Sequence, residues 1–144
     1  MVSEVINYIG VEGKEVSTTA YFNLTRSEVS EISMEIPGGW EGLQERVESD
    51  FKGTFKEYYD IIKMFVAKAY GVKSKDGKGL IKPEEETLKF IASEAYSVII
   101  DKLFSDETGM ALQTFMQKVT EGAKLNSKGK LTVVNAGDDI VEDA

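Results

Sequence analysis

Residues 55–103 read FKEYYDIIKMFVAKAYGVKSKDGKGLIKPEEETLKFIASEAYSVIIDKL and predict two amphipathic helices joined by a glycine-rich loop. In the first helix, apolar side chains recur with the 3.6-residue period of one helix face, and Gly71 follows where a helix end favours positive φ. The second helix is predicted as one piece from Pro83 to Leu103. Its start is indicated by proline, which suits the first turn of a helix, and by the glutamates at residues 84–86, which interact favourably with the positive end of the helix dipole. The apolar positions are Tyr58, Ile62, Phe65, Val66, Ala69, Leu88, Ile91, Ala92, Ala95, Tyr96, Ile99 and Leu103. The two faces are expected to pack together. The predicted shared core holds Phe65, Ala69, Ile91, Ala95, Ile99 and Phe115.

The loop between these helices predicts a small β-hairpin rather than a phosphate-binding site. Asp76-Gly77 is a typical hairpin-turn pair, so residues 72–75 and 78–82 are predicted as short strands. A phosphate-binding loop needs four residues between its first glycine and the Gly-Lys pair, whereas this loop has five. The lysines at 73, 75, 78 and 82 form a local positive cluster, which indicates a solvated loop or, alternatively, a contact with a partner.

The N-terminal segment predicts a longer β-hairpin. Residues 4–11 and 15–24 are rich in β-branched and aromatic side chains, and the second segment alternates with period two. Glu12-Gly13-Lys14 between them is predicted to form the turn. A two-stranded hairpin is marginal in water on its own, so this one must pack on the helices or extend another sheet, including the sheet of a second molecule.

Two short helices are predicted next. Thr25 and Glu28 have the spacing of a capping box, which predicts a helix that Pro37-Gly38-Gly39 ends. Residues 40–47 are predicted as the second helix. The single tryptophan, Trp40, is by default a core residue, and the alternative is an anchor for a partner.

The last predicted helix spans about residues 106–120, with Leu112, Phe115, Met116 and Val119 on one face. The default interpretation is that this face belongs to the core, but methionines also serve adaptable binding grooves.

Beyond the last helix, residues 123–144 are polar and end acidic, which predicts a flexible tail with a short apolar docking strand. The candidate partner-binding residues are Trp40, Leu112, Phe115, Met116, Val119, Leu131 and Val133.

The composition narrows the range of functions. The chain has 144 residues, a formal net charge of −8, and neither cysteine nor histidine. Thiolate chemistry is therefore excluded, and the commonest general base and metal ligand is missing. The net negative charge argues against nucleic-acid binding. No apolar run reaches the roughly 18 residues that a membrane helix needs, and no secretory signal is evident. We predict no catalytic, cofactor or metal site; an enzyme with an unrecognised carboxylate site is the weakest alternative.

These elements predict an α+β, mainly α fold. Residues 1–122 are expected to form one compact helical domain with an N-terminal β-hairpin and a short second hairpin between helices. Residues 123–144 are expected to be a flexible acidic C-terminal tail.

The order of motifs resembles the tail assembly chaperones of long-tailed bacteriophages of Gram-positive hosts. The similarity covers roughly residues 15–120. The matching motifs are Asn23-Leu24-Thr25 with Glu28, Pro37-Gly38-Gly39, Ala69-Tyr70-Gly71-Val72, Ser74, Asp76-Gly77, Ile81-Lys82, Phe90, Ala95-Tyr96 and Phe115. Leu80 and the three glutamates after Pro83 are less typical of that family.

The resemblance implies a mostly helical protein that is not an enzyme. It implies binding of the phage tape measure protein, whose apolar helices would otherwise aggregate while the tail tube polymerises around it. The tail tube protein and self-association are further expected contacts, in the host cytoplasm during assembly and not in the mature virion. The alternative is a small structural virion protein, in the tail or connector, that uses its β-hairpin for inter-subunit contacts.

Overall fold

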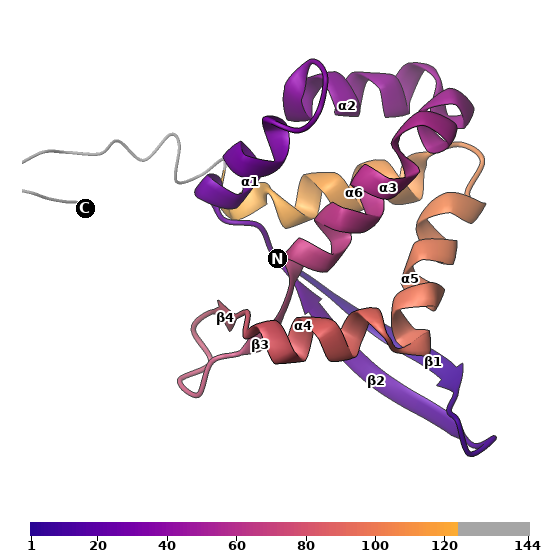
Figure 1. Cartoon of the computed structure of the whole chain (residues 1–144), viewed down its shortest axis with the longest axis vertical. Coiled ribbons are helices and arrows are strands. Elements are labelled where there is room, and N and C mark those ends of the chain that lie inside the picture. The colour runs from indigo at the N-terminus through magenta and orange to yellow at the C-terminus, as the bar shows by residue number, and fades with distance from the viewer. Residues whose placement is uncertain (124–144) are drawn as a thin grey trace, which may run out of the picture.

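The computed structural model describes residues 1–123. The predictions for the tail beyond them, including the apolar patch with Leu131 and Val133, lie outside the described residues. Within residues 1–123 the fold is α+β and mainly α, with an antiparallel sheet at one end of a helical body, as predicted (Figure 1).

The sheet has the order β1-β2-β3-β4 in the described part of the chain. Strands β1 (Val2–Ile9) and β2 (Glu15–Phe22) form the predicted N-terminal hairpin, with Gly13 at positive φ in the turn. Strands β3 (Tyr70–Lys73) and β4 (Leu80–Ile81) form the predicted second hairpin, with Gly77 at positive φ. Strand β3 lies two residues earlier than the predicted 72–75, and β4 covers only two residues of the predicted 78–82. The two hairpins join because β2 also pairs with β3, a long-range contact that no local pattern predicted.

The first helices follow the predicted signals. Helix α1 (Arg26–Ser33) begins with the capping box: the Glu28 amide donates to the Thr25 hydroxyl, and the Thr25 amide donates to the Glu28 carboxylate at 2.9 Å. Helix α2 (Gly39–Ser49) begins at the second glycine of the pair, one residue before the predicted start. Helix α3 (Phe51–Ala69) begins four residues earlier than the quoted pattern, since the Asp50 carboxylate accepts from the Gly53 amide at 3.1 Å and caps it.

Two predictions for this region were wrong. Residues 83–103 are not one helix but α4 (Glu84–Ile91) and α5 (Glu94–Ser105), and the break lies where the Ser93 hydroxyl donates to the Phe90 carbonyl at 2.6 Å. Because of this break Ile91 faces away from the core in which it was predicted, and its side chain is 41% exposed. Gly71 does not have positive φ; it lies in β3, where a Cβ would sit 2.9 Å from the Leu80 Cβ.

The last helix, α6 (Met110–Val119), begins later than predicted. Asp106 lies before it and accepts from the amides of Thr108 and Ala111 at 3.0 Å each, and Gly109 has positive φ. These contacts hold residues 106–109 in a turn that caps the helix rather than joining it.

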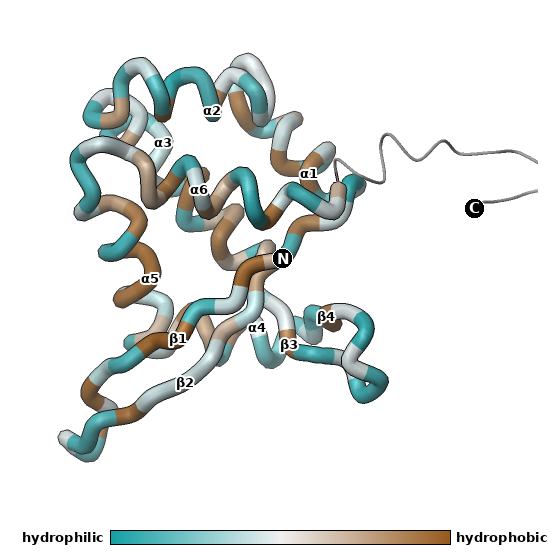
Figure 2. The backbone as a smooth tube through the Cα atoms, turned by 180° about the vertical axis from the view of Figure 1, so that it is seen from behind, coloured by the Kyte–Doolittle hydropathy of each residue, from teal (hydrophilic) through white to brown (hydrophobic). Residues whose placement is uncertain are grey.

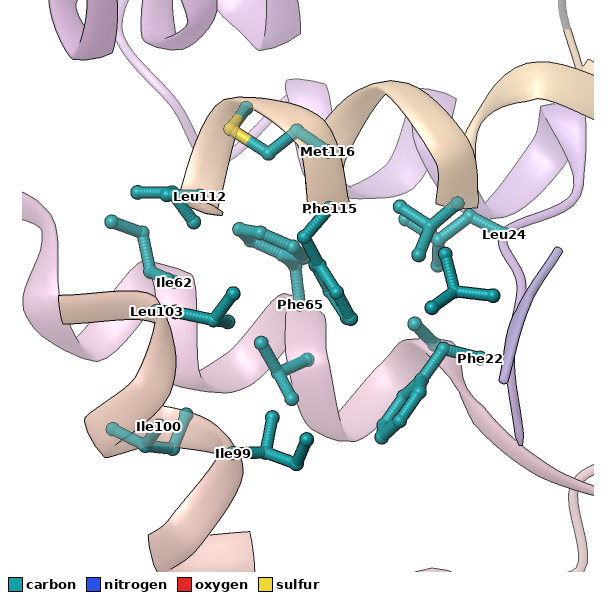
Figure 3. Close-up of a cluster of buried hydrophobic side chains, with 14 of the residues drawn as sticks. Phe22, Leu24, Ile62, Phe65, Ile99, Ile100, Leu103, Leu112, Phe115 and Met116 are labelled. Atoms are coloured by element: carbon teal, nitrogen blue, oxygen red, sulfur yellow. The ribbon is translucent and has the colours of Figure 1, made fainter. Parts of the chain in front are cut away.

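The core lies where α3, α5 and α6 meet the inner face of the sheet (Figure 3). Phe22 of β2 makes edge-on contacts with Phe90 and Phe115, with ring centroids 5.7 and 5.3 Å apart. Apolar and polar segments alternate along the helices in the tube view, and apolar residues also occur along the hairpin, whose distal end extends beyond the helical body (Figure 2).

Candidate interaction surfaces

The structure places the predicted partner-binding residues inside the protein. Leu112, Phe115, Met116 and Val119 are all buried, on the face of α6 that packs against the core (Figure 3). Trp40 is 6% exposed and packs edge-on against Phe65, with the ring centroids 5.1 Å apart. Their burial therefore agrees with the default interpretation, in which these residues belong to the core. A partner would reach the α6 face only after α6 had separated from the body.

A groove of about 780 Å³ runs between α1, α2 and α6. Trp40 lines it, and its indole nitrogen is buried without a hydrogen-bond partner in residues 1–123. The other side chains of this groove are largely polar and acidic, among them Glu41, Gln44, Glu45, Glu48, Gln113 and Gln117. This composition suits polar contacts better than apolar ones.

A largely apolar pocket of about 310 Å³ lies between the start of α3 and the end of α5. Phe55 is 37% exposed, stacks on Tyr59 at 5.5 Å and meets Phe104 edge-on at 4.3 Å. Phe51 meets Phe55 edge-on at 6.5 Å. These four rings, Phe51, Phe55, Tyr59 and Phe104, are called the aromatic patch below. Phe104 is buried, whereas Phe51, Phe55 and Tyr59 stay partly exposed. Large aromatic rings that stay partly exposed are frequent anchors of protein contacts.

Charged side chains surround the aromatic patch. Lys52, Lys56 and Glu107 line the pocket, and the Lys63 ammonium lies 5.2 Å from the centre of the Tyr59 ring. Part of this patch could have been predicted from the sequence, because aromatic residues recur at positions 51, 55 and 59, four residues apart on one helix face. The contribution of Phe104 had no local signal, since it comes from α5 through the tertiary fold.

The distal end of the N-terminal hairpin is a third exposed surface. Val5, Ile9 and Val11 are each more than half exposed, and Val16 is 36% exposed. Near the base of β1, a groove of about 600 Å³ separates the strand from α5 and α6 and is lined by Lys102, Met110 and Lys118.

The lysine cluster of the second hairpin is not uniformly solvated. The Lys82 ammonium is half-buried and contacts the Glu28 carboxylate and the Asn23 carbonyl, both at 2.7 Å. Burial would raise the pKa of Glu28, but hydrogen bonds from Lys82 and from the Thr25 amide outweigh it, and this pKa is lowered. Burial lowers the pKa of Lys82, and the contact with Glu28 opposes that effect only in part. Lys82 thus joins the second hairpin to α1.

Residues 1–123 contain no group of three or more carboxylates, histidines or cysteines that could hold a metal ion. The helices of that part of the chain are all too short or too polar to cross a membrane.

A sequence model of the phage tail assembly chaperones matches residues 1–121 of the chain. The chain belongs to the phage tail assembly chaperone family. No curated protein and no solved structure shows a significant match. Family membership assigns the chaperone a role in phage tail assembly, with phage tail proteins as its class of partner. The matched range includes the aromatic patch, the hairpin and the acidic groove, so each of these surfaces belongs to the family domain.

Proposed function

We propose that this chaperone is a passive, non-enzymatic holder of apolar helical segments of the phage tape measure protein, and that it keeps them soluble while the tail tube assembles. The observation that carries the proposal is the aromatic patch: an apolar pocket between Phe51, Phe55 and Phe104 on the surface of an acidic body. A pocket of this kind suits one or two apolar side chains of an amphipathic helix.

The charges around the pocket support the same partner. Lys52 and Lys56 lie on α3 within one turn of each other and favour acidic side chains beside the apolar stripe of the client. The net charge of −8 keeps one chaperone–client complex apart from the next by repulsion. Holding of this kind needs no nucleotide, since the contact itself covers the apolar surface of the client.

In this proposal the chaperone acts in the host cytoplasm during assembly, leaves before the virion is complete, and contacts the tail tube protein at most transiently. The open end of the hairpin favours the second candidate, a structural virion component joined by inter-subunit sheet pairing. Protein analysis of purified particles separates the two, because a chaperone is absent from them and a structural component is present.

The test is co-expression with the tape measure protein, with the soluble fraction of the tape measure protein as readout. We expect the wild-type chaperone to raise this fraction severalfold and Phe55→Ser to lose most of the gain. Leu88→Ser is the matched control, because Leu88 is a 59% exposed apolar residue on α4. Thermal unfolding of both variants checks that each is folded. The proposal is wrong if the soluble fraction is the same with and without the chaperone.

A further inference from the structure

Strand β1 is an open sheet edge. It stands first in the order β1-β2-β3-β4, and within residues 1–123 its outer side carries no strand. Sheet edges are usually protected by lysine, proline or a bulge, because their free amides and carbonyls template pairing with another strand. Strand β1 reads VSEVINYI and has none of the three: its pairing with β2 runs without interruption from Val2–Phe22 to Ile9–Glu15.

The hairpin turn shows which residues of β1 face the open edge. The Gly10 amide donates to the Lys14 carbonyl at 2.8 Å, so this pair is hydrogen-bonded within the hairpin. Hydrogen-bonded and non-hydrogen-bonded pairs alternate along an antiparallel ladder. Even-numbered residues of β1 therefore bond to β2, while Ser3, Val5, Asn7 and Ile9 direct their backbone amides and carbonyls to the open edge.

We propose that a second copy of this chain pairs with β1 antiparallel, about a two-fold axis at Asn7, so that two hairpins form one continuous sheet. An antiparallel partner bonds to residues that also face outward, so odd-numbered residues must pair with odd-numbered residues. With the axis at Asn7, Val5 lies opposite Ile9 of the second copy on one face, and Ile6 lies opposite Tyr8 on the other. Symmetry produces each apolar pair twice.

Neighbouring allowed registers are worse matched. An axis at Ile6 places Glu4 opposite Tyr8 and Val5 opposite Asn7, and an axis at Val5 places Ile6 opposite Glu4. Each of these registers sets polar or charged side chains against apolar ones on both strands. An axis at Tyr8 places Asn7 opposite Ile9 and Ile6 opposite Gly10. A shift of register changes every cross-strand pair, and of these four registers the axis at Asn7 alone pairs Val5 with Ile9 and Ile6 with Tyr8, with a mismatch at Ser3 opposite Val11.

The ends of the pairing meet a complementary surface. In this register Val11 of the second copy lies opposite Ser3, beside the groove of about 600 Å³ between β1 and helices α5 and α6. Val11 is among the most exposed apolar residues of residues 1–123, and Met110 of the groove is itself 55% exposed. In this register Glu12 of the second copy lies opposite Val2, which lines the same groove as Lys118. The Lys102 ammonium, also in the groove, is already paired with the Glu4 carboxylate at 2.6 Å. The exposed apolar side chains and Lys118 thus agree with the register.

A second copy fits this edge better than the client does. The register is matched by the sequence of β1 with itself, and a helical client has no free strand edge to offer. The inference does not depend on the proposed client: dimerisation is measured on the purified protein alone, so either idea can fail without the other.

Cysteine cross-linking tests the register, since the natural chain has no cysteine to interfere. Asn7→Cys brings two cysteines opposite each other across the axis, with Cα atoms about 5.5 Å apart, which suits a disulfide. Val5→Cys is the matched control, because its two copies are four residues out of register, roughly 14 Å apart. We expect mild oxidation to link Asn7→Cys into dimers at least tenfold faster than Val5→Cys. Equal rates, or faster linkage of Val5→Cys, overturn the register.

The oligomeric state tests the pairing itself. Light scattering coupled to gel filtration is expected to give twice the mass of the chain for wild type. Asn7→Pro removes an outward amide and is expected to give the monomer mass. Ser17→Pro is the control, because Ser17 lies opposite Asn7 but directs its amide to the other edge of the hairpin, and it should stay dimeric. A wild-type chain that is monomeric at every concentration, or that pairs only when a client is added, overturns the proposal.

Discussion

At the residue scale, burial separates side chains that look equivalent in the sequence. Ile91 and Ile99 share one predicted helix face, yet Ile99 is 2% exposed in the core and Ile91 is 41% exposed on α4. The helix break at Ser93 is the reason, because α5 starts again at Glu94 with its own orientation. The periodicity identified the buried face of α5 correctly, since Ala95, Tyr96, Ile99 and Leu103 are all buried. For α4 the prediction was wrong: the predicted face of Leu88, Ile91 and Ala92 is exposed, and Phe90 is the buried side chain.

This difference predicts unequal costs for the same truncation. Ile99→Ala should lower the free energy of unfolding by about 2–5 kcal/mol, because it removes buried methylene groups and leaves a cavity. Ile91→Ala should lower it by less than about 1 kcal/mol, since much of that side chain already contacts water. Urea denaturation of both variants measures the two costs. Equal costs would contradict the break between α4 and α5.

At the element scale, side-chain hydrogen bonds mark the starts of α1, α3 and α6. Asp50 follows the end of α2 and caps α3, so one carboxylate marks the boundary between two helices. Asp106 performs the same function before α6 through the amides of Thr108 and Ala111. The capping box at Thr25 was predictable from its spacing, whereas Asp50 was not recognised because the apolar pattern was read from Phe55 onward.

The cap of α3 carries a measurable share of stability. Asp50→Ala should lower the free energy of unfolding by about 1 kcal/mol, because the Gly53 amide loses its acceptor. Asp60→Ala is the control, since Asp60 is exposed in the middle of the same helix and alanine favours that position. Thermal unfolding of the pair measures the difference. A cost for Asp60→Ala as large as that for Asp50→Ala would rule out capping as the cause.

At the scale of the whole molecule, the Glu28–Lys82 contact ties α1 to the second hairpin across 54 residues of sequence. The folded-state pKa of Glu28 is below its ordinary value of 4.5, so folding favours its charged form. This contribution is fully present above the unfolded-state pKa and is lost as the pH falls through the lower folded-state pKa.

Glu28→Gln isolates that contribution, because glutamine keeps the capping box but loses the charge. We expect the variant to be less stable than wild type at pH 7, and we expect the difference to shrink as the pH falls below the ordinary glutamate pKa of 4.5 and through the lower folded-state pKa. Glu85→Gln is the control for loss of a charge in an exposed ion pair, because the Glu85 carboxylate lies 3.6 Å from the Lys89 ammonium on the surface of α4. Unfolding measured from pH 7 to pH 3 gives both curves. A constant difference between wild type and Glu28→Gln over this range would contradict the ion pair as the cause.

The sequence by itself determined the local elements of this protein. The turns at Gly13 and Gly77, the capping box at Thr25 and the period of each helix depend on backbone conformation and hydrogen bonds within a few residues, so neighbouring residue types predict them. The motif order likewise indicated the chaperone family before any geometry. Only the tertiary structure decided which apolar side chains stay at the surface. Phe104 contacts Phe55, β2 pairs with β3, and Met116 is buried in the core. Packing brings these segments together from distant parts of the sequence, and contacts over such separations have no local sequence pattern that could predict them.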